Sequence, residues 1–118
     1  MKKLVVVFTL FTATLVAGQE ALNASEIASY QTSEMKTVLN LEEEQYEKVA
    51  AINQEFTEKQ VALINEEGSM FGKMGRMRKI IKNKNKALEK ILDGSQMTTY
   101  EDELLPVFRK HFRSKMKK

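Results

Sequence analysis

The 118-residue chain contains no cysteine and only one histidine, His111. Without cysteine, no disulfide can stabilise a small core, and no thiolate can act as a nucleophile or metal ligand. One imidazole gives no support for a Ser-His-acid set or for the two Glu-x-x-His motifs of di-iron helix bundles. We therefore expect a protein that is not an enzyme and that has no cofactor and no metal site.

The chain also has only one proline, Pro106, and it has no long alternation of apolar and polar residues. Alternation of that kind is the mark of half-buried β-strands, whereas apolar residues here recur at intervals of three and four. We predict an all-α fold of four helices, built on a long antiparallel helical hairpin.

The N-terminus predicts export. Lys2 and Lys3 precede an apolar stretch over residues 4–16, and the small residues Ala17 and Gly18 follow it. This order is typical of a secretory signal peptide. The alternative is a retained anchor, but the stretch is shorter than the roughly 20 residues that span a bilayer. We expect residues 1–18 to be removed, leaving residues 19–118 as a single helical domain that does not insert into a membrane.

Charge is divided unequally along the chain. Residues 20–67 carry a net charge of about −8, and residues 68–118 carry about +9. Such halves attract each other within one chain or between two chains. Exported basic proteins rarely meet nucleic acid, so we expect no nucleic-acid partner.

The two longest predicted helices cover residues 42–67 and a second segment that ends at residue 92. This second helix is expected to start at either Ser69 or Lys73. The apolar stripe of the first is Tyr46, Val49, Ile52, Phe56, Gln60 and Leu63. The stripe of the second is Met70, Met74, Met77, Ile81, Lys84, Leu88 and Ile91. Because only a short turn at Gly68 separates them, they should form an antiparallel hairpin about 30–37 Å long.

Shorter helices flank the hairpin. The first is predicted over residues 25–39, with Ser25 as its N-cap. The fourth should start after Asp93, and Pro106 should end or kink it because proline lacks the backbone N–H that a helix needs. We expect the basic residues after Ser114 to be loose.

Two similar pentapeptides open the second and fourth helices, at residues 41–45 and 92–96. Each reads leucine, an acid, two further residues and glutamine. The positions that define this motif are Leu41, Glu42, Gln45, Leu92, Asp93 and Gln96. Because the hairpin returns the end of the third helix to the start of the second, both motifs should lie at the same end of the molecule.

The expected role of the motif is helix capping. Asp93 is a good N-cap, and Gln96 can reach back to its N–H. Glu42 is a poor N-cap, so Asn40, with Glu43 three residues later, is the better candidate at the first copy.

This arrangement resembles the Spy/CpxP family of periplasmic proteins, whose signature is a repeated Leu-Thr-x-x-Gln motif. The resemblance covers residues 20–118, but Glu42 and Asp93 stand where the family has threonine. It implies a bent four-helix hairpin that pairs into a cradle-shaped homodimer in the periplasm. It further implies an ATP-independent chaperone or holdase whose partners are unfolded or misfolded proteins. Two alternatives remain open, namely a stress-response regulator that docks on a sensor kinase and a metal-binding resistance protein.

The basic third helix is the predicted client-binding surface, because long-range charge attracts a partner and methionines adapt to varied surfaces. Its candidate residues are Phe71, Lys73, Met74, Arg76, Met77, Lys79, Ile80 and Lys82. The alternative is a solvated basic face above an ordinary core stripe. Met70, Met74 and Met77 share a helix face and could bind Cu(I), but core packing is the more usual role of such a stripe.

Overall fold

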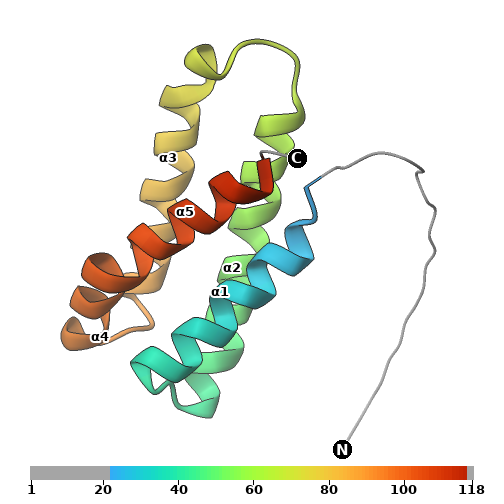
Figure 1. Ribbon diagram of the computed structural model, residues 1–118. Coiled ribbons are helices and arrows are strands. Elements are labelled where there is room, and N and C mark those ends of the chain that lie inside the picture. Colours follow the sequence, from blue (N-terminus) through green and yellow to red (C-terminus); the bar gives the residue numbers. More distant parts are fainter. Residues whose placement is uncertain (1–21, 117–118) are drawn as a thin grey trace, which may run out of the picture.

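The computed structural model describes residues 22–116, all of them in helices or short connections. The helices are α1 (Ala24–Leu39), α2 (Glu43–Asn65), α3 (Met70–Glu89), α4 (Gly94–Thr99), the π-helical segment η1 (Tyr100–Leu104) and α5 (Leu105–Met116) (Figure 1). Because α4, η1 and α5 follow without a break, residues 22–116 form four helices, as predicted. The predicted signal peptide, residues 1–18, lies outside the described residues.

The first helix begins and ends on asparagines. Asn23 is its N-cap, since its side chain accepts a hydrogen bond of 3.0 Å from the Glu26 N–H, and Ser25 lies inside the helix. Asn40 ends the helix in the left-handed conformation, at φ 56°. The predictions that Ser25 caps α1 and that Asn40 caps α2 were therefore wrong. Asparagine tolerates the left-handed region better than most residues, which suits a helix C-terminus.

A short turn over residues 66–69 joins α2 and α3 into the predicted antiparallel hairpin (Figure 1). Gly68 adopts φ 114°, a conformation that strains any residue with a side chain. Ser69 then caps α3, because its hydroxyl accepts a hydrogen bond of 3.1 Å from the Gly72 N–H. Both helices stop two or three residues before their predicted ends, since this turn and the 90–93 turn take up those residues.

The fourth helix continues through Pro106 to Met116, so proline does not end it and residues 115 and 116 are helical. The preceding segment η1 is wound as a π-helix, in which the Leu105 N–H bonds to the Tyr100 carbonyl. Proline in an α-helix clashes with the carbonyl four residues earlier and leaves it without a donor. The wider turn of η1 accommodates this defect, which is why the helix changes its winding and does not break.

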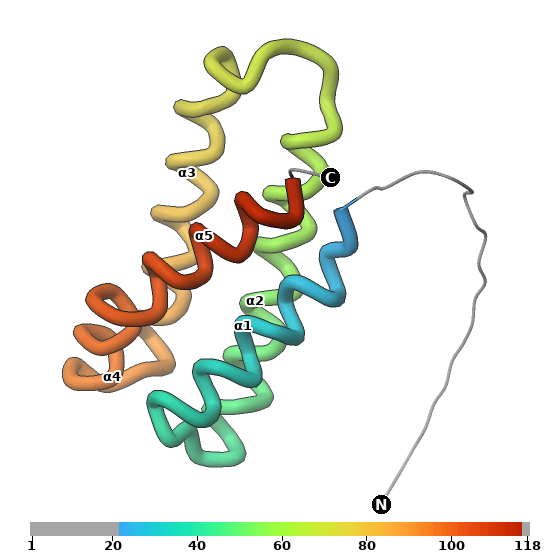
Figure 2. The backbone as a smooth tube through the Cα atoms, viewed as in Figure 1, coloured from blue at the N-terminus to red at the C-terminus, as the bar shows by residue number. Residues whose placement is uncertain are grey.

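The four helices form a flat body of 38 × 37 × 20 Å, about two helix diameters thick. Helix α1 and the fourth helix lie across the α2–α3 hairpin (Figure 2). The main core contains Met35, Leu39, Leu41, Val49, Leu88, Leu92, Met97, Tyr100, Leu104 and Phe108. A second cluster joins Ile27, Val61 and Phe112, and it attaches the end of α5 to α1 and α2. Within residues 22–116, no helix combines the length and the apolar character needed to cross a bilayer.

Candidate functional site

The two pentapeptide motifs meet at one end of the molecule, where their glutamines hydrogen-bond to each other. The Gln45 amide nitrogen donates to the Gln96 amide oxygen at 2.8 Å, and the Gln96 nitrogen donates back at 3.3 Å. Each nitrogen also donates to a backbone carbonyl of the opposite segment, Gln45 to Ile91 and Gln96 to Leu39, both at 3.1 Å. We call this pair the glutamine clasp.

The same glutamines cap their own helices. The Glu42 N–H donates to the Gln45 amide oxygen, and the Asp93 N–H donates to the Gln96 amide oxygen, each at 3.0 Å. Glu42, and not Asn40, is thus the N-cap residue of α2. The motif leucines, Leu41 and Leu92, are both buried in the main core. All six motif residues therefore hold two helix starts together, which is a structural role.

Replacing Asp93 with alanine is expected to lower the free energy of unfolding by about 1 kcal/mol. The Asp93 carboxylate accepts a hydrogen bond of 2.8 Å from the Gln96 N–H, and alanine leaves that donor without a protein partner. Urea denaturation measures the change. Ser95→Ala in the same helical turn is the matched control and should change little; an equal loss in both variants would contradict the capping role.

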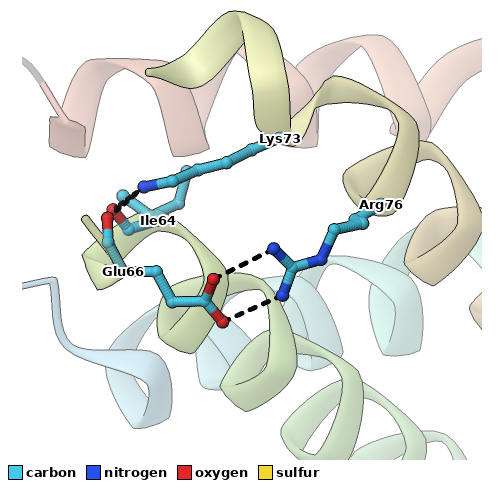
Figure 3. Close-up of polar contacts among 4 residues, drawn as sticks. All are labelled: Ile64, Glu66, Lys73 and Arg76. Carbon is cyan, nitrogen blue, oxygen red and sulfur yellow. Dashed lines mark hydrogen bonds and ion pairs between the residues drawn. The ribbon is translucent and has the colours of Figure 1, made fainter. Parts of the chain in front are cut away.

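Two residues of the predicted client-binding surface are engaged at the hairpin turn (Figure 3). Lys73 is buried, and its ammonium donates to the Ile64 carbonyl at 3.0 Å and to the Glu66 carbonyl. Arg76 pairs with the Glu66 carboxylate through two hydrogen bonds, of 2.9 and 3.0 Å. The bidentate bond from Arg76 lowers the pKa of Glu66, and the same bond raises the pKa of Arg76.

Lys73 therefore does not belong to an exposed basic surface, which corrects the sequence prediction. A helix leaves its last carbonyls without internal donors, and the ammonium satisfies carbonyls at the end of α2. Met77 and Ile80 are half-buried, and Met77 turns inward, where the Gln60 amide nitrogen lies 3.5 Å from its sulfur. These residues stabilise the hairpin, so the accessible part of the predicted surface is smaller than expected.

The remaining predicted residues lie on an exposed face of α3. Phe71 is 85% exposed, and Met74, one turn along, is 48% exposed. Lys79 and Lys82 are also exposed, as is Arg78, which the prediction did not include. We call Phe71, Met74, Arg78, Lys79 and Lys82 the α3 face. It presents two large apolar side chains at the tip of the hairpin with three cations below them.

A cleft of about 180 Å³ lies between the hairpin and the fourth helix, and sequence reasoning missed it. Met77, Ile81, Leu105, Phe108 and Phe112 form much of its wall. Its most buried polar lining residues are Gln31, Lys84 and Tyr100. Its exposed lining includes Arg109 and Arg113.

Lys84 is the unusual residue of this cleft, because it is only 5% exposed and no carboxylate pairs with it among the described residues. Its ammonium donates a hydrogen bond of 2.7 Å to the Gln31 amide oxygen. Burial lowers the pKa of Lys84 to about 8. The signal was present in the sequence, since Lys84 interrupts the apolar stripe predicted for the third helix.

Tyr100 also lines the cleft and is fully buried. Its hydroxyl has no hydrogen-bond partner among residues 22–116. Burial raises the pKa of Tyr100, and the nearby Glu101 charge adds to the increase. The phenol is therefore a neutral donor at physiological pH.

His111 packs between the fourth helix and α1, where its ring stacks on Tyr30 with centroids 4.0 Å apart. Burial lowers the pKa of His111, Lys115 lowers it further, and Glu26 opposes the change. The imidazole is thus a packing group in this structure. Across residues 22–116, no three His, Cys, Asp or Glu side chains are grouped so as to hold a metal ion.

Comparison of the chain with the profiles of protein families, with curated proteins and with solved structures gives no significant match.

Proposed function

We propose that this protein is an exported, ATP-independent chaperone of the holdase kind that binds unfolded or aggregating proteins in the periplasm. The observation that carries the proposal is the exposure of Phe71, 85% open to solvent at the start of the basic helix α3, together with its exposed neighbours Met70 and Met74. Contiguous exposed apolar side chains of this kind mark interaction sites more often than single ones do.

The composition of the α3 face suits transient binding of varied chains. Arg78, Lys79 and Lys82 supply a positive field that raises the rate of encounter with acidic segments. Phe71 and Met74 then offer apolar contact, and methionine adapts its shape to different partners. The apolar area is small, so clients would be held loosely and released without ATP.

A homodimer is part of the proposal. The body is only 20 Å thick, and a hairpin covered by helices on one side leaves its other side open. Pairing of two such bodies would place two α3 faces on one assembly and raise avidity for a long unfolded client. Export is supported by the basic, then apolar, then small-residue order of residues 2–18.

The proposal is tested by removing the apolar part of the α3 face. The double variant Phe71→Ser, Met74→Ser should lose most of the ability to suppress aggregation of two unrelated denatured proteins, followed by light scattering without ATP. Its stability should stay nearly unchanged because both side chains are exposed. Val38→Ser is the matched control, since Val38 is 42% exposed at the C-terminal end of α1.

The charged residues of the α3 face can be tested separately from its apolar residues. The triple variant Arg78→Gln, Lys79→Gln, Lys82→Gln should slow capture and weaken its dependence on salt, while the final extent of binding changes less. If the unaltered protein suppresses aggregation of neither client, the chaperone proposal fails. The next candidate is then a regulator that docks on a single envelope sensor.

A further inference from the structure

We propose that the cleft between the hairpin and the fourth helix binds a free fatty carboxylate, with the carboxylate held at Lys84 and Tyr100 and the alkyl chain along the apolar wall. The site is separate from the α3 face, because neither Phe71 nor Met74 lines the cleft. The inference therefore does not depend on the proposed chaperone function.

The buried cation is the first reason. Lys84 has three N–H donors, and one of them bonds to Gln31. Burying a lysine without a carboxylate partner is costly, and proteins keep such groups most often at functional sites. A carboxylate in the cleft would supply the missing charge and accept the remaining donors.

The second reason is the unpartnered phenol. The Tyr100 hydroxyl is buried and makes no hydrogen bond to the part of the chain that the structure describes, although nearly all buried hydroxyls in proteins are hydrogen-bonded. The Lys84 ammonium can only donate hydrogen bonds, and the Tyr100 hydroxyl can donate one more. An ammonium and a hydroxyl in the lining of one cleft favour an anionic oxygen ligand over a cationic one.

The apolar wall of the cleft indicates that the part of the ligand beyond its carboxylate is an alkyl chain. Met77, Ile81, Leu105, Phe108 and Phe112 offer only apolar side-chain surface. A peptide segment placed there would bury backbone N–H and C=O groups without partners, which an alkyl chain does not have. The volume of about 180 Å³ is below the range of roughly 300–1,000 Å³ usual for compact drug-sized ligands, so a single chain fits best.

The exposed part of the lining adds charge complementarity. Arg109 and Arg113 lie one helical turn apart on α5, and neither takes part in an ion pair of the described residues. Together with Lys84 they give the lining of the cleft a positive charge. An anionic amphiphile would therefore be attracted to the opening before its carboxylate reaches Lys84.

Calorimetric titration of the protein with decanoate below its micelle concentration tests the inference. We expect one decanoate per chain, and decanol, which has the same chain without the charge, should bind about 10- to 100-fold more weakly. Lys84→Met should weaken the binding of decanoate by a similar factor and leave the binding of decanol unchanged. Lys86→Met, which removes an exposed lysine of α3 outside the cleft and outside the α3 face, should alter the binding of neither ligand.

A second variant tests binding in the cleft without changing the charge of its lining. Leu105→Trp enlarges a half-buried wall residue and should block decanoate and decanol alike, while circular dichroism confirms that the helices remain. Equal binding of decanoate and decanol, unchanged decanoate binding in Lys84→Met, or uptake of many decanoates per chain would each overturn the inference.

Discussion

Replacing Gln96 with methionine should lower the free energy of unfolding by about 2–3 kcal/mol, more than any other change at the two helix starts. The Gln96 amide makes four hydrogen bonds, two with Gln45, one to the Leu39 carbonyl and one from the Asp93 N–H. Methionine has nearly the same length but cannot make these bonds. The Leu39 carbonyl would then lose its partner in a partly buried place, and the Asp93 N–H would lose the bond that caps α4.

Urea denaturation of a small set of variants measures this effect. Gln54→Met is the matched control, because Gln54 bonds only to exposed side chains and should change stability by less than about 0.5 kcal/mol. A double-mutant cycle of Gln45→Met with Gln96→Met should give a coupling energy of about 1 kcal/mol, since the two side chains contact each other. Purely additive losses would mean that the clasp does not hold in solution.

Removing the buried polar pair Lys84 and Gln31 should stabilise the protein, in contrast to the loss of the glutamine clasp. The double variant Lys84→Met, Gln31→Leu is expected to raise the free energy of unfolding by roughly 3 kcal/mol at pH 7, because the folded-state pKa of Lys84 is about 8 against an ordinary 10.5. Both side chains are changed so that Gln31 is not left with an unpaired buried oxygen.

The pH dependence gives the sharper test. Below pH 8, Lys84 is protonated in both the folded and unfolded chains, and the full cost of burying the charge is present. Above pH 8, the folded chain releases the proton while the unfolded chain keeps it up to about 10.5, so stability rises with pH. The burial of Tyr100 raises its pKa and acts in the opposite direction above about pH 10, where only the unfolded chain ionises.

Denaturation midpoints between pH 7 and 9.5 should therefore rise in the unaltered protein and stay level in the double variant. Lys79→Met provides the control, because an exposed lysine should leave the rise intact. A rise of equal size in the double variant would assign it to another group and contradict the burial of a charged Lys84.

The sequence was sufficient for the helices and for the meeting of the motifs. Spacings of three and four predicted the hairpin, and glutamine at the third position of each helix predicted the reach back to the cap residue. The caps were harder to predict, because Asn23 and Ser25 are both good N-cap residues in isolation, and Asn40 could have capped α2 but instead ends α1. Their roles depend on where the chain must turn, which tertiary packing decides.

The α3 face shows the limit of helical periodicity. The pattern places Phe71, Lys73 and Met74 within one turn, yet the first and third are exposed and Lys73 is buried. The difference arises because the ammonium of Lys73 meets carbonyls at the end of α2, a contact across a turn that no periodicity describes. Likewise, periodicity does not predict the π-helical turn ahead of Pro106. That turn keeps both Tyr100 and Leu104 buried in the core while the helix continues past the proline.

The glutamine clasp also bears on the order in which the chain folds. Lys73 and Ile64, which close the hairpin turn, are 9 residues apart, whereas Gln45 and Gln96 are 51 residues apart. The entropy lost on closing a loop grows with its length, so the turn should form early and the clasp late. The clasp would then act as a latch, absent from the folding transition state, whose bonds govern how long the folded chain persists more than how fast it folds.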